Sequence, residues 1–100
     1  MARKAIQIPE GDQPLLTFDV PSGGVSGSTI SFVVKSNNNQ SDGSALATIS
    51  GSVVGDTQFT VQINSTVGAL AAGVYWYKVV LTKSARPVTR QWGPLEIINT

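Results

Sequence analysis

The carboxylates are the first residues to consider for chemistry, because the chain has no histidine and no cysteine. They are Glu10, Asp12, Asp19, Asp42, Asp56 and Glu96. A general acid and its base need two carboxyl groups that face each other across a cleft. Glu10 and Asp12 share one turn, and the spacing of the others pairs none of them. We therefore expect turn and surface acids, with no catalytic residues.

Other sites for catalysis or cofactors are equally poorly supported. Ser41–Ser44 falls far short of a calcium-binding loop. Neither Gly23-Gly24 nor Gly51–Gly55 is followed by the Lys-Ser/Thr pair of a phosphate loop. The serines have no histidine to activate them. The sequence thus predicts a protein that is not an enzyme and holds no metal or cofactor.

The two tryptophans are better candidates for function. Trp76 lies in the stretch 71–83, where Tyr75, Tyr77, Val79 and Leu81 share the opposite parity and are expected to face the core. The face of Trp92 depends on whether Gly93-Pro94 resets the phase of its strand. Either indole could cap the edge of the core, since tryptophan is highly buried on average. Either could instead anchor a partner protein.

Basic residues near these tryptophans extend the candidate partner-binding set. Arg86 and Arg90 are expected on the same hairpin as the indoles and could frame an aromatic patch. Arg3 and Lys4 form a short basic arm ahead of Pro9. Residues 1–9 could pair as a strand with a neighbouring molecule or form an edge strand of their own sandwich. The second interpretation is the simpler one.

Composition limits the remaining classes. One hundred residues form one domain, 1–100, and 41% hydrophobic residues suffice for one small core. Charged residues make up 13%, below the ~25% typical of soluble domains. A net charge of +1 argues against nucleic acid or an anionic membrane as partner. No apolar run approaches ~20 residues, and no apolar segment follows the basic start, so we expect a chain made in the cytoplasm.

Alternation of apolar and polar residues predicts short strands and little helix. Asn64 or Ser65 could cap one helical turn that ends at Gly73, and 51–55 is expected to be flexible. Ser36–Ser44 is expected to be a solvated, mobile hairpin tip, with a sugar-binding or partner-binding loop as the alternative. About seven strands predict an all-β, immunoglobulin-like antiparallel sandwich. The expected strands are 4–8, 15–20, 29–35, 45–50, 57–63, 71–83 and 88–98, the last interrupted at Gly93-Pro94.

Four short motifs follow one another along the chain. They are Ile6–Phe18 with its Gly-Asp turn, Gly27-Ser28-Thr29-Ile30-Ser31-Phe32, Leu70–Val79 with its Gly-x-Tyr-x-Tyr, and Gly93-Pro94-Leu95-Glu96-Ile97. In this order the chain resembles small immunoglobulin-like domains of tailed bacteriophages, related to the N-terminal domain of baseplate upper proteins. The resemblance covers residues 6–98.

This resemblance implies a structural role in the virion, after synthesis in the bacterial host cytoplasm. A start at Met1 without a long extension favours a free-standing capsid decoration protein, which would bind and stabilise the assembled head. A baseplate, tail or neck component is the alternative within the same class. A carbohydrate-binding or adhesive module is the alternative from another class. The expected partners are capsid or other virion proteins, and the resemblance implies a homo-oligomer, with a trimer as the first expectation.

Overall fold

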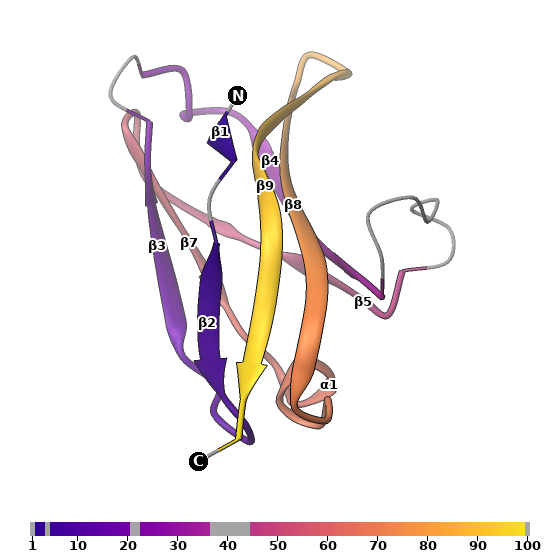
Figure 1. Ribbon diagram of the computed structural model, residues 1–100. Coiled ribbons are helices and arrows are strands. Elements are labelled where there is room, and N and C mark those ends of the chain that lie inside the picture. Colours follow the sequence, from indigo (N-terminus) through magenta and orange to yellow (C-terminus); the bar gives the residue numbers. More distant parts are fainter. Residues whose placement is uncertain (1, 4, 21–22, 37–44, 100) are drawn as a thin grey trace.

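The chain forms a sandwich of two β-sheets in a computed structural model that describes residues 2–3, 5–20, 23–36 and 45–99 (Figure 1). The larger sheet contains β1 (Ala2–Arg3), β2 (Ile6–Pro9), β4 (Thr29–Lys35), β5 (Ala47–Ser50), β8 (Gly73–Lys83) and β9 (Arg86–Ile98). The smaller sheet contains β3 (Leu15–Asp19), β6 (Ser52–Gly55) and β7 (Gln58–Gln62). One helical turn, α1 (Ser65–Gly68), joins β7 to β8.

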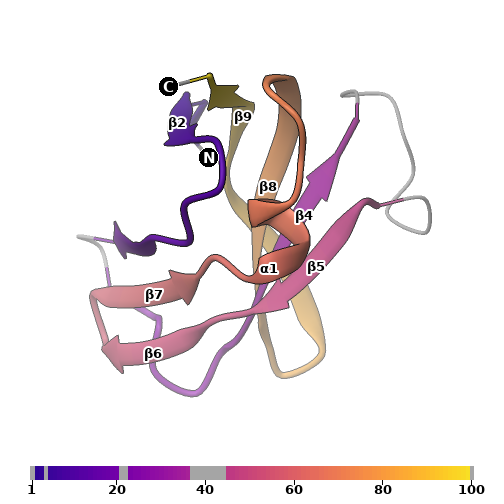
Figure 2. The ribbon, with the colours of Figure 1, turned by 90° about the horizontal axis from the view of Figure 1, so that it is seen from below.

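The strand order is that of an immunoglobulin-like sandwich. The larger sheet runs β1-β9-β8-β4-β5, with β2 also on β9, and the smaller runs β3-β7-β6. β1 and β2 lie parallel to β9, and every other pair is antiparallel. Gly51 is the single residue between β5 and β6, where the chain crosses from one sheet to the other (Figure 2). The predicted fold class is therefore confirmed.

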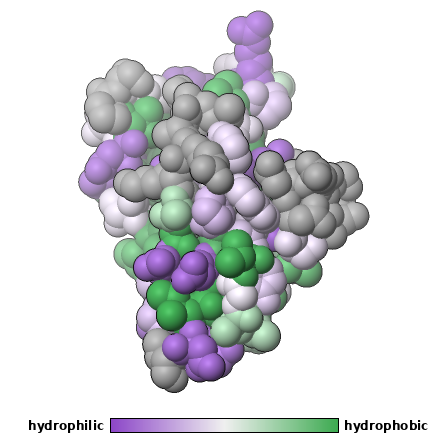
Figure 3. Space-filling view, in the orientation of Figure 1, coloured by the Kyte–Doolittle hydropathy of each residue, from purple (hydrophilic) through white to green (hydrophobic). Residues whose placement is uncertain are grey.

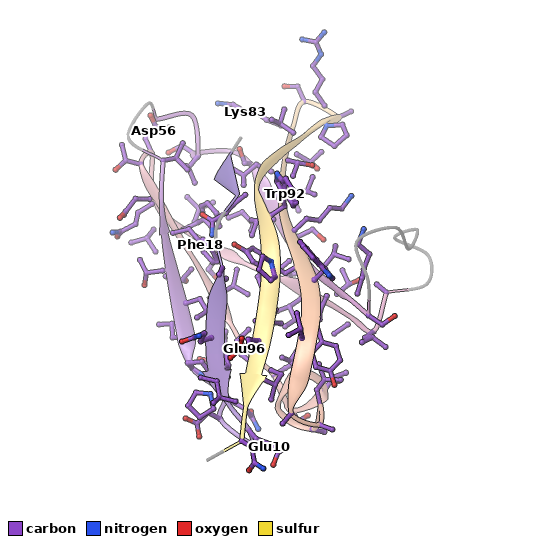
Figure 4. The ribbon with its side chains drawn as sticks, viewed as in Figure 1. Glu10, Phe18, Asp56, Lys83, Trp92 and Glu96 are labelled. Carbon is purple, nitrogen blue, oxygen red and sulfur yellow. The ribbon has the colours of Figure 1, made fainter. Side chains whose placement is uncertain are left out.

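Aromatic residues link the two sheets in place of a disulfide. Phe18 stacks on Phe59 with ring centroids 5.0 Å apart and lies 6.3 Å from Phe32 (Figure 4). Phe32 in turn stacks on Tyr77 at 5.4 Å. The hydroxyl of Tyr75 donates to the Ala71 carbonyl at 2.8 Å, which is the tyrosine corner of immunoglobulin-like domains.

Most predicted strands are present with small shifts at their ends. Thr29–Lys35 forms as predicted, and Phe59, Val61 and Ile63 are buried as expected. The prediction that Ser36–Ser44 is a mobile tip lies outside the described residues apart from Ser36 itself. The helical turn forms, and the Asn64 side chain accepts a hydrogen bond from the Val67 N–H at 3.2 Å.

Three local predictions were wrong. The segment 51–55 contains strand β6, because its backbone pairs with β7. The helical turn ends at Gly68, where the Ala69 N–H already closes it on Ser65, and not at Gly73. Gly93-Pro94 does not interrupt the last strand, because β8 pairs with β9 through both residues. No helix among the described residues is long and apolar enough to cross a membrane.

Candidate partner-binding face

The β8–β9 hairpin positions both tryptophans. A two-residue turn at Ser84–Ala85, with φ values of 53° and 63°, aligns Lys83 with Arg86. The pairing then shifts, because Val80 lies opposite Thr89 and Val79 lies opposite Gln91. Arg90 is therefore one extra residue in β9 relative to β8, which makes it a β-bulge. After the bulge, each side chain of β9 points to the face opposite to the one that uninterrupted alternation would give it. This bulge lies three residues earlier than the Gly93-Pro94 position at which the sequence suggested one.

The bulge places Trp92 on the same face as Trp76. Trp92 lies opposite Lys78, and Trp76 lies opposite Pro94, all on the side of the larger sheet that faces away from the core. The two indoles lie with centroids 6.3 Å apart and an interplanar angle of 25°. Both are half-buried. An offset, near-parallel pair of this kind is a favourable aromatic contact, and it leaves part of each ring exposed to a partner.

The neighbouring strand β4 supplies buried side chains to this face. Phe32 and Val34 point into the core, so Val33 and Lys35 point outward, opposite Lys78 and Trp76. Even so, Val33 is only 4% exposed and Lys35 only 8%. Long lysine side chains commonly pack their methylene groups along apolar surface while the ammonium group reaches a polar site. The outer face is therefore packed rather than loosely solvated.

We define the outer patch as Val33, Lys35, Trp76, Lys78 and Trp92. At one end of it, Val74 is 58% exposed beside its cross-strand neighbour Glu96. Figure 4 shows Glu96 on the same strand as Trp92. In the space-filling view, apolar residues gather in the lower half and are interleaved with hydrophilic ones (Figure 3). A mixed surface of this kind suits a partner protein better than a lipid surface.

Sequence reasoning found the indoles and missed the two residues that β4 contributes. The signal was present in the run Phe32-Val33-Val34, because an uninterrupted apolar run predicts a strand that is buried on both faces. Alternation alone assigns Val33 to solvent, whereas in the structure Val33 is 4% exposed.

Arg86 lies away from the outer patch. Six residues of extended strand, about 20 Å, separate Arg86 from Trp92. Arg86 instead lines a surface cavity of about 360 Å³ at the hairpin tip, together with Lys83 and Val88. The expectation that Arg86 frames the indoles is therefore wrong.

The N-terminal residues form part of the larger sheet. Arg3 occupies β1 and is the register partner of Trp92, and Ile6–Pro9 continues along β9. These residues thus form an edge of their own sandwich, as the simpler interpretation held. Lys4 and the side chains of Arg3 and Arg90 lie outside the described residues.

Three of the carboxylates act as structural hydrogen-bond acceptors at separate places. Glu10 accepts from the Ala72 N–H at 2.8 Å, and Asp19 accepts from the Gln58 amide at 2.9 Å. Backbone N–H groups of Gly24 and Ser26 hold the pKa of Asp56 below its ordinary value. Among the described residues, no three acidic, histidine or cysteine side chains are grouped as metal ligands.

One buried phenol lies behind the patch, on the core side of β8. Burial raises the pKa of Tyr77, and a hydrogen bond that its hydroxyl accepts from the Gln91 amide at 2.7 Å opposes that rise. The phenol is thus held neutral and positioned, with a structural role.

Comparison of the sequence with protein-family models and with curated proteins finds no match. The outer patch is therefore the feature of this chain from which a function can be inferred. Its content is two stacked indoles and two lysines on one packed sheet face, with an exposed valine beside it. That arrangement offers aromatic and aliphatic contact area on one sheet face.

Proposed function

We propose that this chain is a non-enzymatic structural protein of a phage virion, a capsid decoration protein that binds the assembled head through the outer patch. The observation that carries the proposal is the stacked pair Trp76 and Trp92 on the outer face of the larger sheet. Tryptophan is enriched among the residues that dominate binding energy at protein interfaces. The motif order that resembles phage immunoglobulin-like domains supports the virion as the place of action.

The rest of the molecule suits this role. A low content of charge leaves little like-charge repulsion when many copies and a shell come together. A face that is already packed loses little side-chain entropy on binding. A protein that binds only the assembled head stabilises it by mass action. A homo-oligomer, with a trimer as the first expectation, would multiply the contacts.

Binding to purified phage particles tests the proposal. We expect the chain to sediment with expanded heads and to raise the temperature at which they break open. Trp76→Ala and Trp92→Ala should each weaken head binding about 30-fold, since a truncated interface indole costs about 2 kcal/mol. Val54→Ala is the matched control, because Val54 is 59% exposed on the other sheet.

Three other results would redirect or overturn the proposal. Binding to isolated tails and not to heads would favour the baseplate, tail or neck alternative. Binding to a glycan array that Trp76→Ala abolishes would favour the carbohydrate-binding module. Melting temperatures that fall in proportion to head binding in both tryptophan variants would assign the indoles a folding role only.

A further inference from the structure

β3 has a free edge with unpaired backbone groups. Among the described residues, its only strand partner is β7, in antiparallel register. The Val20 N–H donates to Thr57 at 2.8 Å, and the Ile63 N–H donates to the Pro14 carbonyl at 3.0 Å. Hydrogen-bonded and non-hydrogen-bonded pairs alternate along an antiparallel ladder, so residues 14, 16, 18 and 20 bond to β7. The N–H and C=O groups of Leu15, Thr17 and Asp19 therefore point away from it.

Within the described part of the chain, these three residues have no other backbone partner. Immunoglobulin sheets of the ABED type carry their first strand at this edge. Here the first strands, β1 and β2, pair with β9 in the other sheet instead (Figure 1). The smaller sheet therefore ends one strand early, and its edge is available to a strand from another chain.

A cavity of about 220 Å³ lies along this edge, between the two sheets. Its lining residues are Ile6, Leu16, Thr17, Phe18, Asp19 and Gln91. Four of them are consecutive in β3, so the cavity follows the backbone edge of the strand rather than one of its faces. A cavity of about 150 Å³ can hold a benzene ring. This one has room for an aliphatic side chain from an added strand.

The edges of β2 and β6 are poorer templates. The Glu10 N–H donates to Ile98, so Gln7 and Pro9 are the β2 residues that face away from β9, and proline has no N–H to offer. The β6 edge is broken by a register shift between Val53 and Gly55. The β3 edge combines three outward-facing residues with an adjoining cavity.

We propose that the free edge of β3 binds an extended segment of a partner protein, added as an antiparallel strand. The side chains along this edge determine which residues the added strand should have at each position. A basic residue opposite Asp19 complements the carboxylate, and aliphatic residues opposite Phe18 and Leu16 fill the cavity. A polar residue matches Thr17, and an apolar one covers Leu15, which is 58% exposed. This inference is independent of the outer patch and of the proposed function.

A synthetic peptide provides the probe: acetyl-Ser-Lys-Val-Thr-Ile-Leu-Ser-amide, which has the required order when it runs antiparallel to β3. We expect it to slow amide hydrogen exchange at Leu15, Thr17 and Asp19 at least tenfold, as measured by NMR. Exchange at Leu16 and Phe18 should change little, because their amides already bond to β7. This alternation is specific to strand addition.

Two matched controls remove one hydrogen bond each. The same peptide methylated on the backbone nitrogen of its threonine should protect the three amides at least tenfold less at equal concentration. Thr17→Pro removes the facing N–H from the protein, and an edge strand tolerates proline where its N–H faces solvent. If that variant fails to fold, the methylated peptide still tests the inference with the unaltered protein.

Several results would overturn the inference. These are no protection at millimolar peptide, protection centred on β6 instead, or equal protection by the methylated peptide. Protection of the three amides that rises with protein concentration and without peptide would identify a second copy as the occupant. Trp76→Ala should leave peptide binding unchanged, so failure of the outer patch and failure of this edge are distinguishable.

Discussion

Asp56 connects the loop after β3 to the turn between β6 and β7. Its backbone carbonyl accepts from the Val25 N–H at 3.0 Å, and its carboxylate accepts from the Ser26 N–H at 3.2 Å. Gly23 approaches closely, at a φ of 80°, and a Cβ there would lie 2.7 Å from the Asp56 Oδ2. Hydrogen bonds from Gly24 and Ser26 lower the pKa of the carboxyl group, and Lys83 assists. The ionised form is therefore the one that the folded loop favours.

The acid dependence of stability should report this carboxylate. Because the folded pKa lies below the ordinary value of 3.8, its stabilisation is present above that pH and is lost as pH falls through the folded pKa. We expect Asp56→Asn to be less stable than the natural chain at about pH 7 and to approach it at about pH 2.5. Urea midpoints at both values measure this. A gap between the two proteins that stays constant across the range would contradict the assignment.

At the scale of strands, the alternation of apolar and polar residues is enough to predict a strand whose inward face is buried. Gln58–Gln62 was predictable because its inward residues Phe59 and Val61 repeat with period two. The inward residues of Thr29–Lys35 repeat in the same way, although Val33 and Lys35 on its other face are buried as well. β6 could not be predicted from the sequence, because all four of its residues are exposed and only its pairing with β7 makes it a strand. Gly93 and Pro94 resemble a strand break in sequence, yet the neighbouring β8 holds them in the ladder.

For a related reason, the sequence predicts the orientation of only one of the two indoles in the candidate site. The outward direction of Trp76 follows from parity within its own strand. The direction of Trp92 depends on the bulge at Arg90, which is a property of the pairing between two strands and not of any residue type. The β3 edge was equally hidden, because a sequence does not state which strands lack a neighbour.

The corner between β5 and β6 requires a glycine. A Cβ on Gly51 would lie 2.6 Å from the Ile30 Cγ2 and 2.8 Å from the Thr60 carbonyl oxygen. Gly51→Ala should therefore cost about 2 kcal/mol, as overpacking of a tight site does. Gly55→Ala is the control, since nothing lies within 4 Å of its added Cβ, and it should change stability by less than about 0.5 kcal/mol. Equal urea midpoints for the two variants would refute the close approach.

The β8–β9 turn offers a stabilising substitution. Ala85 has a φ of 63°, a left-handed conformation that costs a residue with a Cβ about 1–2 kcal/mol. Ala85→Gly should raise the free energy of unfolding by about 0.5–1 kcal/mol after the greater freedom of glycine in the unfolded chain is subtracted. Ala71→Gly should have the opposite sign, because Ala71 is not among the residues of positive φ. Thermal unfolding of both variants decides between these outcomes.

At the scale of the whole molecule, the two sheets are joined unevenly. On one side β5 passes directly into β6 through Gly51, whereas on the other side β2 and β3 are joined by residues 10–14 and, among the described residues, do not pair with each other as strands. Tyr77 lies two residues after the corner tyrosine, the position at which antibody domains carry the second cysteine of their intersheet disulfide. A row of aromatic contacts from β7 through β3 and β4 to β8, of which the contact between the sheets is tilted, takes the place of that bond.

Phe18 is one of the two inner members of this row of four rings and is 7% exposed, so its loss should destabilise the contact between the two sheets. Phe18→Ala should cost about 3–5 kcal/mol. That is a large part of the 5–15 kcal/mol typical of a domain, and it should lower the melting temperature by at least about 12 °C. Phe18→Leu should cost less, since it keeps more of the buried volume. Leu15→Ala, on the exposed side of the same strand, should cost less than about 0.5 kcal/mol. If Phe18→Ala proved no more destabilising than Leu15→Ala, cohesion between the sheets would not depend on the aromatic row.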